Sequence, residues 1–128
     1  MENEFLKDKK ILIVEDDLSS RLYLNKILEK TGAVLFNASD GQEAIDITRN
    51  EPGIDVILMD IQLPVIDGYD SANKIREIRK NIIIIAQTAY SLLGDREKII
   101  ASGFDDYIVK PILPRQLIDR IVNALIKG

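Results

Sequence analysis

The sequence predicts an α/β fold, a (βα)5 doubly wound sheet of five parallel strands with helices on both faces. Short apolar runs rich in β-branched residues alternate five times with longer segments whose apolar residues recur with a helical period. This order makes the strands parallel and packs helices onto both faces of the sheet. The 128 residues, 46% hydrophobic and 30% charged, suffice for one domain with a buried core.

The short apolar runs are the predicted strands. Four of them look buried on both faces, as parallel strands between two helical layers are. The run at 34–38 has polar flanks, which favours a place at the edge of the sheet. In chain order the runs are Ile11–Val14, Val34–Ala38, Val56–Met59, Ile82–Ala86 and Tyr107–Val109.

Each run is followed by a segment with the apolar stripe of an amphipathic helix. The first is expected to end with Gly32 as its C-cap, the second to begin with the capping box of residues 40–43, and the fourth to stop near Gly103. The stripes are Leu18, Leu22, Ile27 and Leu28; Ala44, Ile45 and Ile47; Tyr69, Ala72, Ile75 and Ile78; Leu92, Leu93, Ile99 and Ile100; and Leu117, Ile118, Ile121, Val122 and Leu125.

The composition excludes several classes of function. The chain has no Cys and no His, which excludes disulfides, Cys- or His-ligated metal sites, catalytic triads and a phosphohistidine carrier. A net charge of −4 argues against direct binding of nucleic acid or of an anionic membrane. No apolar run approaches the ~20 residues of a membrane span, and residues 1–10 do not resemble a signal peptide. We therefore expect a cytoplasmic protein without membrane contact.

Polar residues collect where the predicted strands end. Because ligands of open α/β sheets bind at the carboxyl ends of the strands, these residues are expected to share one rim. Acids placed together repel one another unless a cation lies among them, and an all-oxygen set suits Mg²⁺. Asp60 is then the candidate nucleophile for phosphoryl transfer, with Lys110 and Thr88 positioned to meet an anion. The residues after the strands are Glu15, Asp16 and Asp17; Asp60; Gln87 and Thr88; and Lys110 and Pro111.

Each of these residues also has a simpler structural explanation. Asp16 or Asp17 could cap the first helix, and Asp60 could be a turn acid before Pro64. Thr88 could be a turn hydroxyl, and Lys110 a solvated lysine. Their joint placement at the ends of four strands is harder to explain in this way.

Four motifs in chain order resemble the receiver domain of two-component response regulators. The resemblance covers residues 9–127, after a lead-in of residues 1–8, and implies a flavodoxin-like strand order of 2-1-3-4-5. Residues 6–10 and 86–91 look most like receivers of hybrid histidine kinases. The motifs are Lys10–Asp17, Leu58–Pro64 with Asp67-Gly68, Gln87-Thr88-Ala89 and Asp106–Pro111.

The resemblance assigns the metal site and the acceptor. Asp60 matches the phosphoacceptor, and Asp16 matches a direct Mg²⁺ ligand. Glu15 stands where many members of the family have Asp, and its longer side chain suits contact with Mg²⁺ through water. Asp60 itself and the backbone carbonyl of Gln62 would complete the protein ligands.

The resemblance also assigns the residues that respond to phosphorylation. Lys110 matches the lysine that contacts the phosphoryl group, and Lys110–Pro111 is a candidate cis bond. Thr88 and Tyr107 match the switch hydroxyl and the switch aromatic. The side chains of Gln62 and Tyr90 would flank the phosphoryl group and tune its hydrolysis.

The implied function is a signalling switch. The domain would take a phosphoryl group from the phosphohistidine of a histidine kinase or a histidine phosphotransfer domain, catalysing its own phosphorylation and dephosphorylation with Mg²⁺. Phosphorylation would reshape the face formed by the fourth helix, the fifth strand and the fifth helix, through which the domain could also dimerise. The domain would stand alone or belong to a larger protein, such as the cytoplasmic part of a membrane-bound hybrid kinase.

Three alternatives predict different features. A phosphatase of the haloacid-dehalogenase type needs Asp-x-Asp after the first strand, whereas Asp60 follows the third. A flavin-binding protein of the same fold needs a phosphate loop where the acids at 15–17 stand. A pseudo-receiver that only binds partners would lack a site residue, and none is missing.

Overall fold

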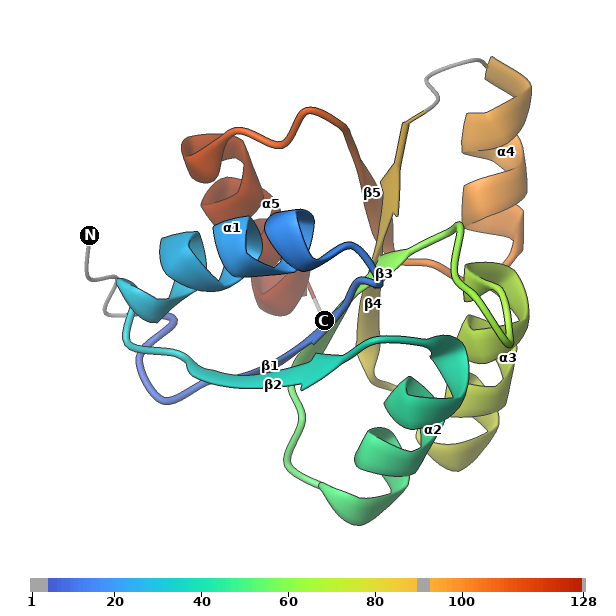
Figure 1. Cartoon of the computed structure of the whole chain (residues 1–128), viewed down its shortest axis with the longest axis horizontal. Coiled ribbons are helices and arrows are strands. Elements are labelled where there is room, and N and C mark those ends of the chain that lie inside the picture. Colours follow the sequence, from blue (N-terminus) through green and yellow to red (C-terminus); the bar gives the residue numbers. More distant parts are fainter. Residues whose placement is uncertain (1–4, 90–92, 128) are drawn as a thin grey trace.

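Five parallel strands form one sheet in the computed structural model, which describes residues 5–89 and 93–127 (Figure 1). The strand order is β2-β1-β3-β4-β5, as expected. The strands are β1 (Lys10–Val14), β2 (Val34–Ala38), β3 (Val56–Asp60), β4 (Ile83–Thr88) and β5 (Asp106–Val109). The helices are α1 (Leu18–Glu29), α2 (Gly41–Asn50), α3 (Gly68–Ile78), α4 (Leu93–Ala101) and α5 (Pro114–Lys127).

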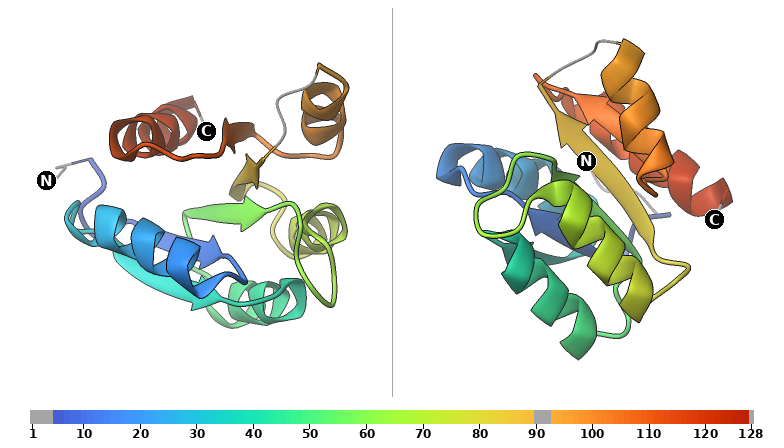
Figure 2. Two further views of the ribbon diagram at one scale, coloured as in Figure 1. Left: turned by 45° about the horizontal axis from the view of Figure 1, so that its top comes forward. Right: turned by 90° about the vertical axis from the view of Figure 1, so that its right-hand side faces the viewer.

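The helices cover both faces of the sheet and divide the core into two layers (Figure 2). Buried residues of α1 and α5 pack on one face, and those of α2, α3 and α4 pack on the other. Successive strand residues point to opposite faces, so Ile11 and Ile13 of β1 join the α1–α5 layer while Leu12 and Val14 join the other. The doubly wound arrangement is therefore confirmed.

The two outer strands differ from the three inner ones. β2 lies at an edge, as predicted, and of its residues only Ala38 is buried. β5 forms the other edge, so the expectation that it is buried on both faces is wrong. Ile108 is buried, Tyr107 and Val109 are half-buried, and no strand within the described ranges pairs with the outer side of β5. Tyr107 is thus a half-buried aromatic on the edge strand, packed against the α2–α4 layer.

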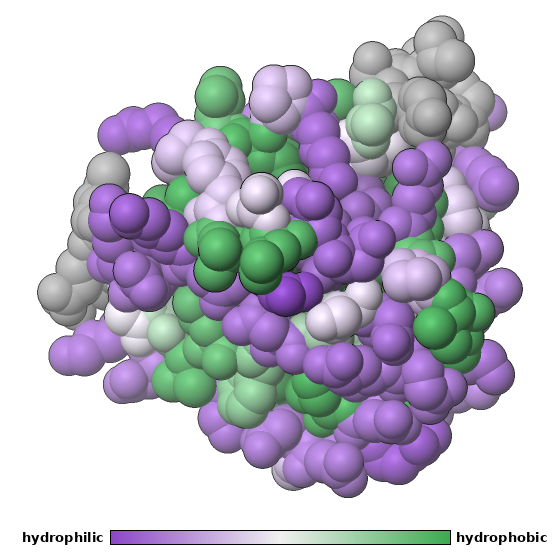
Figure 3. All heavy atoms as spheres, viewed as in Figure 1, coloured by the Kyte–Doolittle hydropathy of each residue, from purple (hydrophilic) through white to green (hydrophobic). Residues whose placement is uncertain are grey.

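The predicted apolar stripe of α1 is only half correct. Ile27 and Leu28 are buried together with Leu24, but Leu18 and Leu22 are 58% and 59% exposed. The helix carries apolar residues on two faces, and the one with Leu24, Ile27 and Leu28 packs on the sheet. The other contributes to the apolar side chains that gather over α1 on the surface (Figure 3).

Side-chain caps and one glycine fix the helix ends. Asp17, Asp40 and Asp67 are N-caps whose carboxylates accept hydrogen bonds from backbone N–H groups in the first turns of α1, α2 and α3. Gly32 is not the C-cap of α1, which is Lys30. It lies two residues farther on with a φ of 85°, where the chain turns toward β2 and a side chain would be strained.

The ends of the described chain add two details. Leu6 is fully buried in the α1–α5 layer, and the Asp8 N–H donates to the Gly32 carbonyl, so this part of the predicted lead-in packs on the sheet. Within α4, Ile99 is buried and Ile100 is exposed, whereas Leu92 of the predicted stripe lies outside the described residues. No helix in the described ranges has the length and apolar character needed to cross a membrane.

Candidate functional site

Four strand ends bring the predicted site residues to one rim of the sheet. Glu15 directly follows β1, Asp60 ends β3, Thr88 ends β4 and Lys110 directly follows β5. Parallel pairing aligns these ends, with Asp60 beside Gln87 and Thr88 beside Val109. The sequence predicted this placement because the strand-end rule needs only the order of the elements.

Lys110 links two carboxylates from different strands. Its Nζ lies 2.9 Å from Asp60 Oδ2 and 3.3 Å from Glu15 Oε1. The side chains of Glu15 and Asp60 are 1% and 9% exposed, so these charge-assisted bonds lie largely out of water. The simpler interpretation of Lys110 as a solvated lysine is therefore wrong.

The backbone around Asp60 is held by the start of α3. Asp60 Oδ1 accepts a hydrogen bond of 2.9 Å from the Gln62 N–H, and the Gly68 N–H donates to the Ile61 carbonyl at 2.9 Å. A Cβ atom at Gly68 would lie 2.5 Å from the Asp60 carbonyl oxygen, so only glycine permits this approach. The motif that contains Gly68 did not predict this contact, because the sequence does not show how closely α3 approaches β3.

Three acids form a cluster whose chemistry fits a hard cation. Carboxylate oxygens of Glu15, Asp16 and Asp60 all lie within 4.8 Å of one another. Asp17 has a different role, since its carboxylate accepts the Ser20 N–H at 2.9 Å, a bond that also holds the pKa of Asp17 below its usual range. The capping explanation is therefore correct for Asp17, and Asp16 is left for the cluster. Oxygen ligands alone suit Mg²⁺.

The electrostatics of the cluster disfavour ionisation of Glu15. Burial, followed by the charge of Asp60, raises the pKa of Glu15 to about 7. Burial by itself would lower the pKa of Lys110, but its hydrogen bond to Asp60 and the two nearby negative charges outweigh this effect and raise the pKa. A cation bound among the acids would relieve the repulsion that acts on Glu15.

Thr88 and Tyr107 lie on the same face of the sheet, Thr88 at the end of β4 and Tyr107 on β5. Tyr107 pairs with Ala86, two residues before Thr88, so both side chains point toward the α2–α4 layer. Thr88 is buried and Tyr107 is half-buried. A cavity of about 60 Å³ lies between Asp60, Thr88 and Lys110 and is also lined by Gln62 and Tyr69.

The remaining predicted features have mixed outcomes. The Lys110–Pro111 bond is cis, as expected. The Gln62 side chain is exposed, while Tyr90 lies outside the described residues. Tyr69 was predicted only as part of a helix stripe, yet it lines the cavity beside Asp60 because α3 begins one residue before it.

Replacing Glu15 by Gln should change how stability depends on pH in the metal-free protein. Folding raises the pKa of Glu15 from 4.5 to about 7. The protonated Glu15 side chain therefore contributes fully to the free energy of unfolding below pH 4.5, and this contribution is lost as the pH rises through 7. Urea unfolding in EDTA should therefore show Glu15→Gln more stable than the wild type by about 1–3 kcal/mol at pH 8, with little difference at pH 4.

The exposed Glu97→Gln serves as the control and should leave the pH dependence unchanged. Mg²⁺ should reduce the advantage of Glu15→Gln at pH 8, because a bound cation stabilises the folded protein that has the ionised carboxylate. A variant that is equally destabilised at both pH values would contradict the proposed repulsion.

Comparison with known proteins agrees with this geometry. Residues 11–122 match the family model of the response regulator receiver domain. The chain is 39% identical over 127 residues to hybrid signal transduction histidine kinase I of Dictyostelium discoideum, covering 93% of this chain but 7% of that protein. The chain thus spans a small part of that relative.

Two solved structures share the fold and much of the length. The receiver domain of sensor histidine kinase PA1611 from Pseudomonas aeruginosa PAO1, solved with a magnesium ion coordinated in its active site cleft, is 34% identical with a TM-score of 0.84, covering 94% of this chain and 98% of that one. The receiver domain of Saccharomyces cerevisiae Ssk1, solved with the histidine phosphotransfer protein Ypd1, is 33% identical with a TM-score of 0.84, covering 91% and 88%. With its matched family model and its strand-end acids and lysine, the chain belongs to the response regulator receiver domains of two-component signalling.

Proposed function

We propose that Asp60 accepts a phosphoryl group from the phosphohistidine of a histidine kinase or a histidine phosphotransfer domain. The observation that carries this proposal is the Asp60 carboxylate at the end of β3, held by Lys110 Nζ at 2.9 Å beside two further acids. A carboxylate oxygen of Asp60 attacks phosphorus, an O–P bond forms, and the P–N bond to the imidazole breaks. The product is an acyl phosphate, and the imidazole takes up a proton.

Other residues of this chain assist the transfer and the later hydrolysis of the acyl phosphate by water. Lys110 neutralises charge on the equatorial oxygens, and Thr88 donates its hydroxyl hydrogen to one of them. The domain thus catalyses its own phosphorylation and dephosphorylation. The side chains of Gln62 and Tyr90 flank the phosphoryl group and set the rate of hydrolysis.

The acid cluster is the proposed Mg²⁺ site. Asp16 and Asp60 would hold the ion directly, Glu15 would act through water, and the Gln62 carbonyl would complete the protein ligands. The bound ion supplies positive charge to the phosphoryl oxygens. The all-oxygen donors, the raised pKa of Glu15 and the magnesium in the PA1611 receiver support this assignment.

The proposed setting is a phosphorelay in the cytoplasm. The similarity to a hybrid histidine kinase and to a receiver bound to a phosphotransfer protein supports a partner that presents phosphohistidine. We assign residues 9–127 to the receiver and residues 1–8 to a lead-in, of which Leu6 packs in the α1–α5 layer. The α4-β5-α5 face serves as the output and as a surface for dimerisation.

Phosphorylation is proposed to act on that face through Thr88 and Tyr107. When Thr88 turns toward the phosphoryl oxygens it leaves space on its face of the sheet. The Tyr107 ring, half-buried on the edge strand, turns inward to fill that space. Burying its exposed part contributes about 1–2 kcal/mol, which shifts a two-state population about tenfold.

Incubation with acetyl phosphate and Mg²⁺ should add about 80 Da, the mass of one phosphoryl group, to the wild-type protein. Asp60→Asn should show no adduct, because it removes the nucleophile and keeps the shape. Asp17→Asn, which keeps the cap of α1, should be labelled like the wild type. Labelling of Asp60→Asn by intact-mass spectrometry would refute the assignment of the acceptor.

Calorimetric titration with Mg²⁺ should separate the two neighbouring acids. Asp16→Asn should weaken Mg²⁺ binding at least about tenfold, a loss of roughly 1.4 kcal/mol. Asp17→Asn should bind within about twofold of the wild type, because Asn can still cap the helix. If Asp17→Asn shows the larger loss, the metal ligands have been assigned one residue out of register.

Beryllofluoride with Mg²⁺ should mimic the phosphoryl group and test the switch. In ¹H–¹⁵N NMR spectra we expect shifts from Thr88 through α4 to Tyr107, because movement of the hydroxyl frees space for the ring. Thr88→Ala should confine the shifts to residues around Asp60. Confinement in the wild type as well would show that the domain relays phosphoryl groups without this conformational output.

A further inference from the structure

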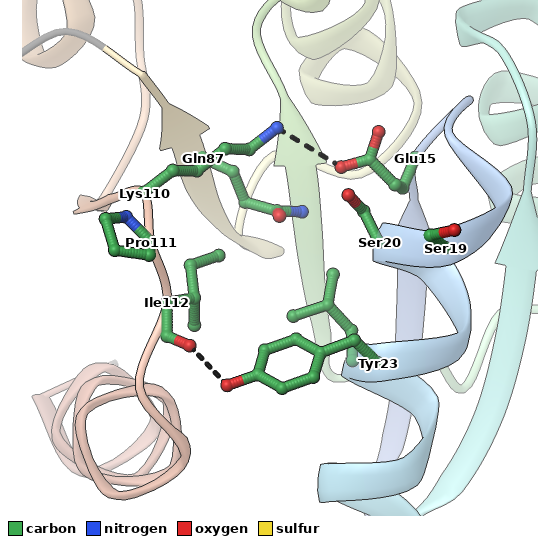
Figure 4. Close-up of a pocket in the computed structure, with 9 residues that line it drawn as sticks. Glu15, Ser19, Ser20, Tyr23, Gln87, Lys110, Pro111 and Ile112 are labelled. Atoms are coloured by element: carbon green, nitrogen blue, oxygen red, sulfur yellow. Dashed lines mark hydrogen bonds and ion pairs between the residues drawn. The ribbon is translucent and has the colours of Figure 1, made fainter.

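A second cavity lies beneath the rim that holds Asp60, between α1 and the segment joining β5 to α5. Its volume is about 390 Å³, within the range of small-molecule sites. Tyr23 and Leu24 contribute one wall and Pro111 and Ile112 the other, and the Tyr23 hydroxyl donates to the Ile112 carbonyl at 2.7 Å across it (Figure 4). The two walls come from segments far apart in sequence, and the Tyr23–Ile112 hydrogen bond joins them.

The Gln87 side chain points from β4 toward this cavity and forms part of its wall (Figure 4). It is fully buried, and in the described part of the chain neither its Oε1 nor its Nε2 has a hydrogen-bond partner. A buried carboxamide with no partner costs free energy for both the donor and the acceptor that lost water. Such a group is rare in folded proteins, and it indicates that something supplies the missing bonds.

Gln87 does not belong to the hydrogen-bond network of the phosphoacceptor. Lys110 binds Asp60 and Glu15, and backbone N–H groups bind the remaining carboxylate oxygens of that pair, so the network is formed without the Gln87 amide. Asp60 lines the separate cavity of about 60 Å³ and does not line the larger one. Gln87 and Lys110 line both cavities and so lie between them.

The lining defines which ligand would fit. Four largely apolar side chains favour an apolar body, Ser19 and Ser20 add hydroxyl groups to the α1 wall, and the Gln87 carboxamide offers a donor beside an acceptor. The nearest charges, Glu15 and Lys110, already pair with each other, and the surrounding acids leave an excess of negative charge that disfavours anions. A neutral carboxamide matches Gln87 best, because it supplies an acceptor and a donor side by side.

We propose that this cavity is a binding site for a small neutral molecule with an apolar body and a carboxamide edge, which pairs with the Gln87 side chain. The site is distinct from the phosphoacceptor pocket, but Glu15 and Lys110 both line this cavity and lie close to Asp60. A ligand there would lie beside the two groups that set the charge around Asp60.

Benzamide is the probe, and acetophenone is its matched control because it keeps the ring and the carbonyl but has no N–H donor. In ¹H–¹⁵N NMR titrations of the wild type, benzamide should shift the Gln87 side-chain NH₂ signals and the backbone signals of Tyr23 and Ile112. Benzamide should bind about tenfold more tightly than acetophenone, the ratio expected for one added buried hydrogen bond. Equal affinities, or shifts that avoid these residues, would overturn the proposal.

Two variants test whether the Gln87 amide causes the preference for benzamide over acetophenone. Gln87→Met keeps the volume and removes both polar atoms, so the preference for benzamide should fall to within about twofold. Tyr23→Phe keeps the ring at the wall and should retain the tenfold preference. A preference that survives in Gln87→Met would show that another group recognises the amide.

The melting temperature of the ligand-free protein gives an independent measurement. Gln87→Met should raise it by about 4 °C, because the variant removes two unpaired polar atoms from the interior. A lower melting temperature would show that the Gln87 amide is already paired in the free protein, and the proposal would fail.

Discussion

The ammonium group of Lys110 joins two carboxylates that belong to different strands, at 2.9 Å from Asp60 and 3.3 Å from Glu15. These three groups come from the ends of β1, β3 and β5, so their contact requires the whole sheet to be in register. Because both carboxylates are nearly buried, removing the lysine would leave two close negative charges with little water around them. The position of Asp60 and the fit for a cation follow from this arrangement, whereas burial and the charge of Asp60 raise the pKa of Glu15 against the opposing effect of Lys110.

Backbone contacts hold the loop after β3, next to the proposed acceptor Asp60. The segment from β3 to α3 is anchored by the Gly68–Ile61 hydrogen bond and by close contact of Gly68 with the Asp60 carbonyl. Val65 in this loop has a φ of 70°, a conformation that costs a β-branched residue roughly 1–3 kcal/mol. The hydrogen bonds of Gln62 and Gly68 fix the backbone on either side of this residue, and a nucleophile needs such a fixed position.

β5 is less buried than the inner strands β1, β3 and β4. It is an edge strand with half-buried Tyr107 and Val109, so a side chain there can change its burial without disturbing the core. Thr88 lies on the same face of the neighbouring strand, at the end that borders the acceptor. A fixed acceptor and an adjustable edge strand are thus joined through β4, and Gln87, on the opposite face of β4 from Thr88, borders the larger cavity.

Most of the fold and the main site residues could be predicted from the sequence. Alternation of short β-branched runs with helical stripes determined the order of the elements, and that order places Glu15, Asp60, Thr88 and Lys110 at one rim by the geometry of parallel strands alone. The absence of His and Cys left carboxylates as the candidate metal ligands, and the strand-end position of Asp60 made it the candidate nucleophile.

Only the tertiary structure decided the features that depend on contacts between distant segments. α1 has apolar residues on two faces, and packing against the sheet selected the one with Leu24 rather than the one with Leu18. The periodicity of β5 did not reveal that it lies at an edge, because that depends on its neighbours. The approach of Gly68 to Asp60 and the unpaired amide of Gln87 arise where strands, helices and loops meet in space, and no local pattern records those distances.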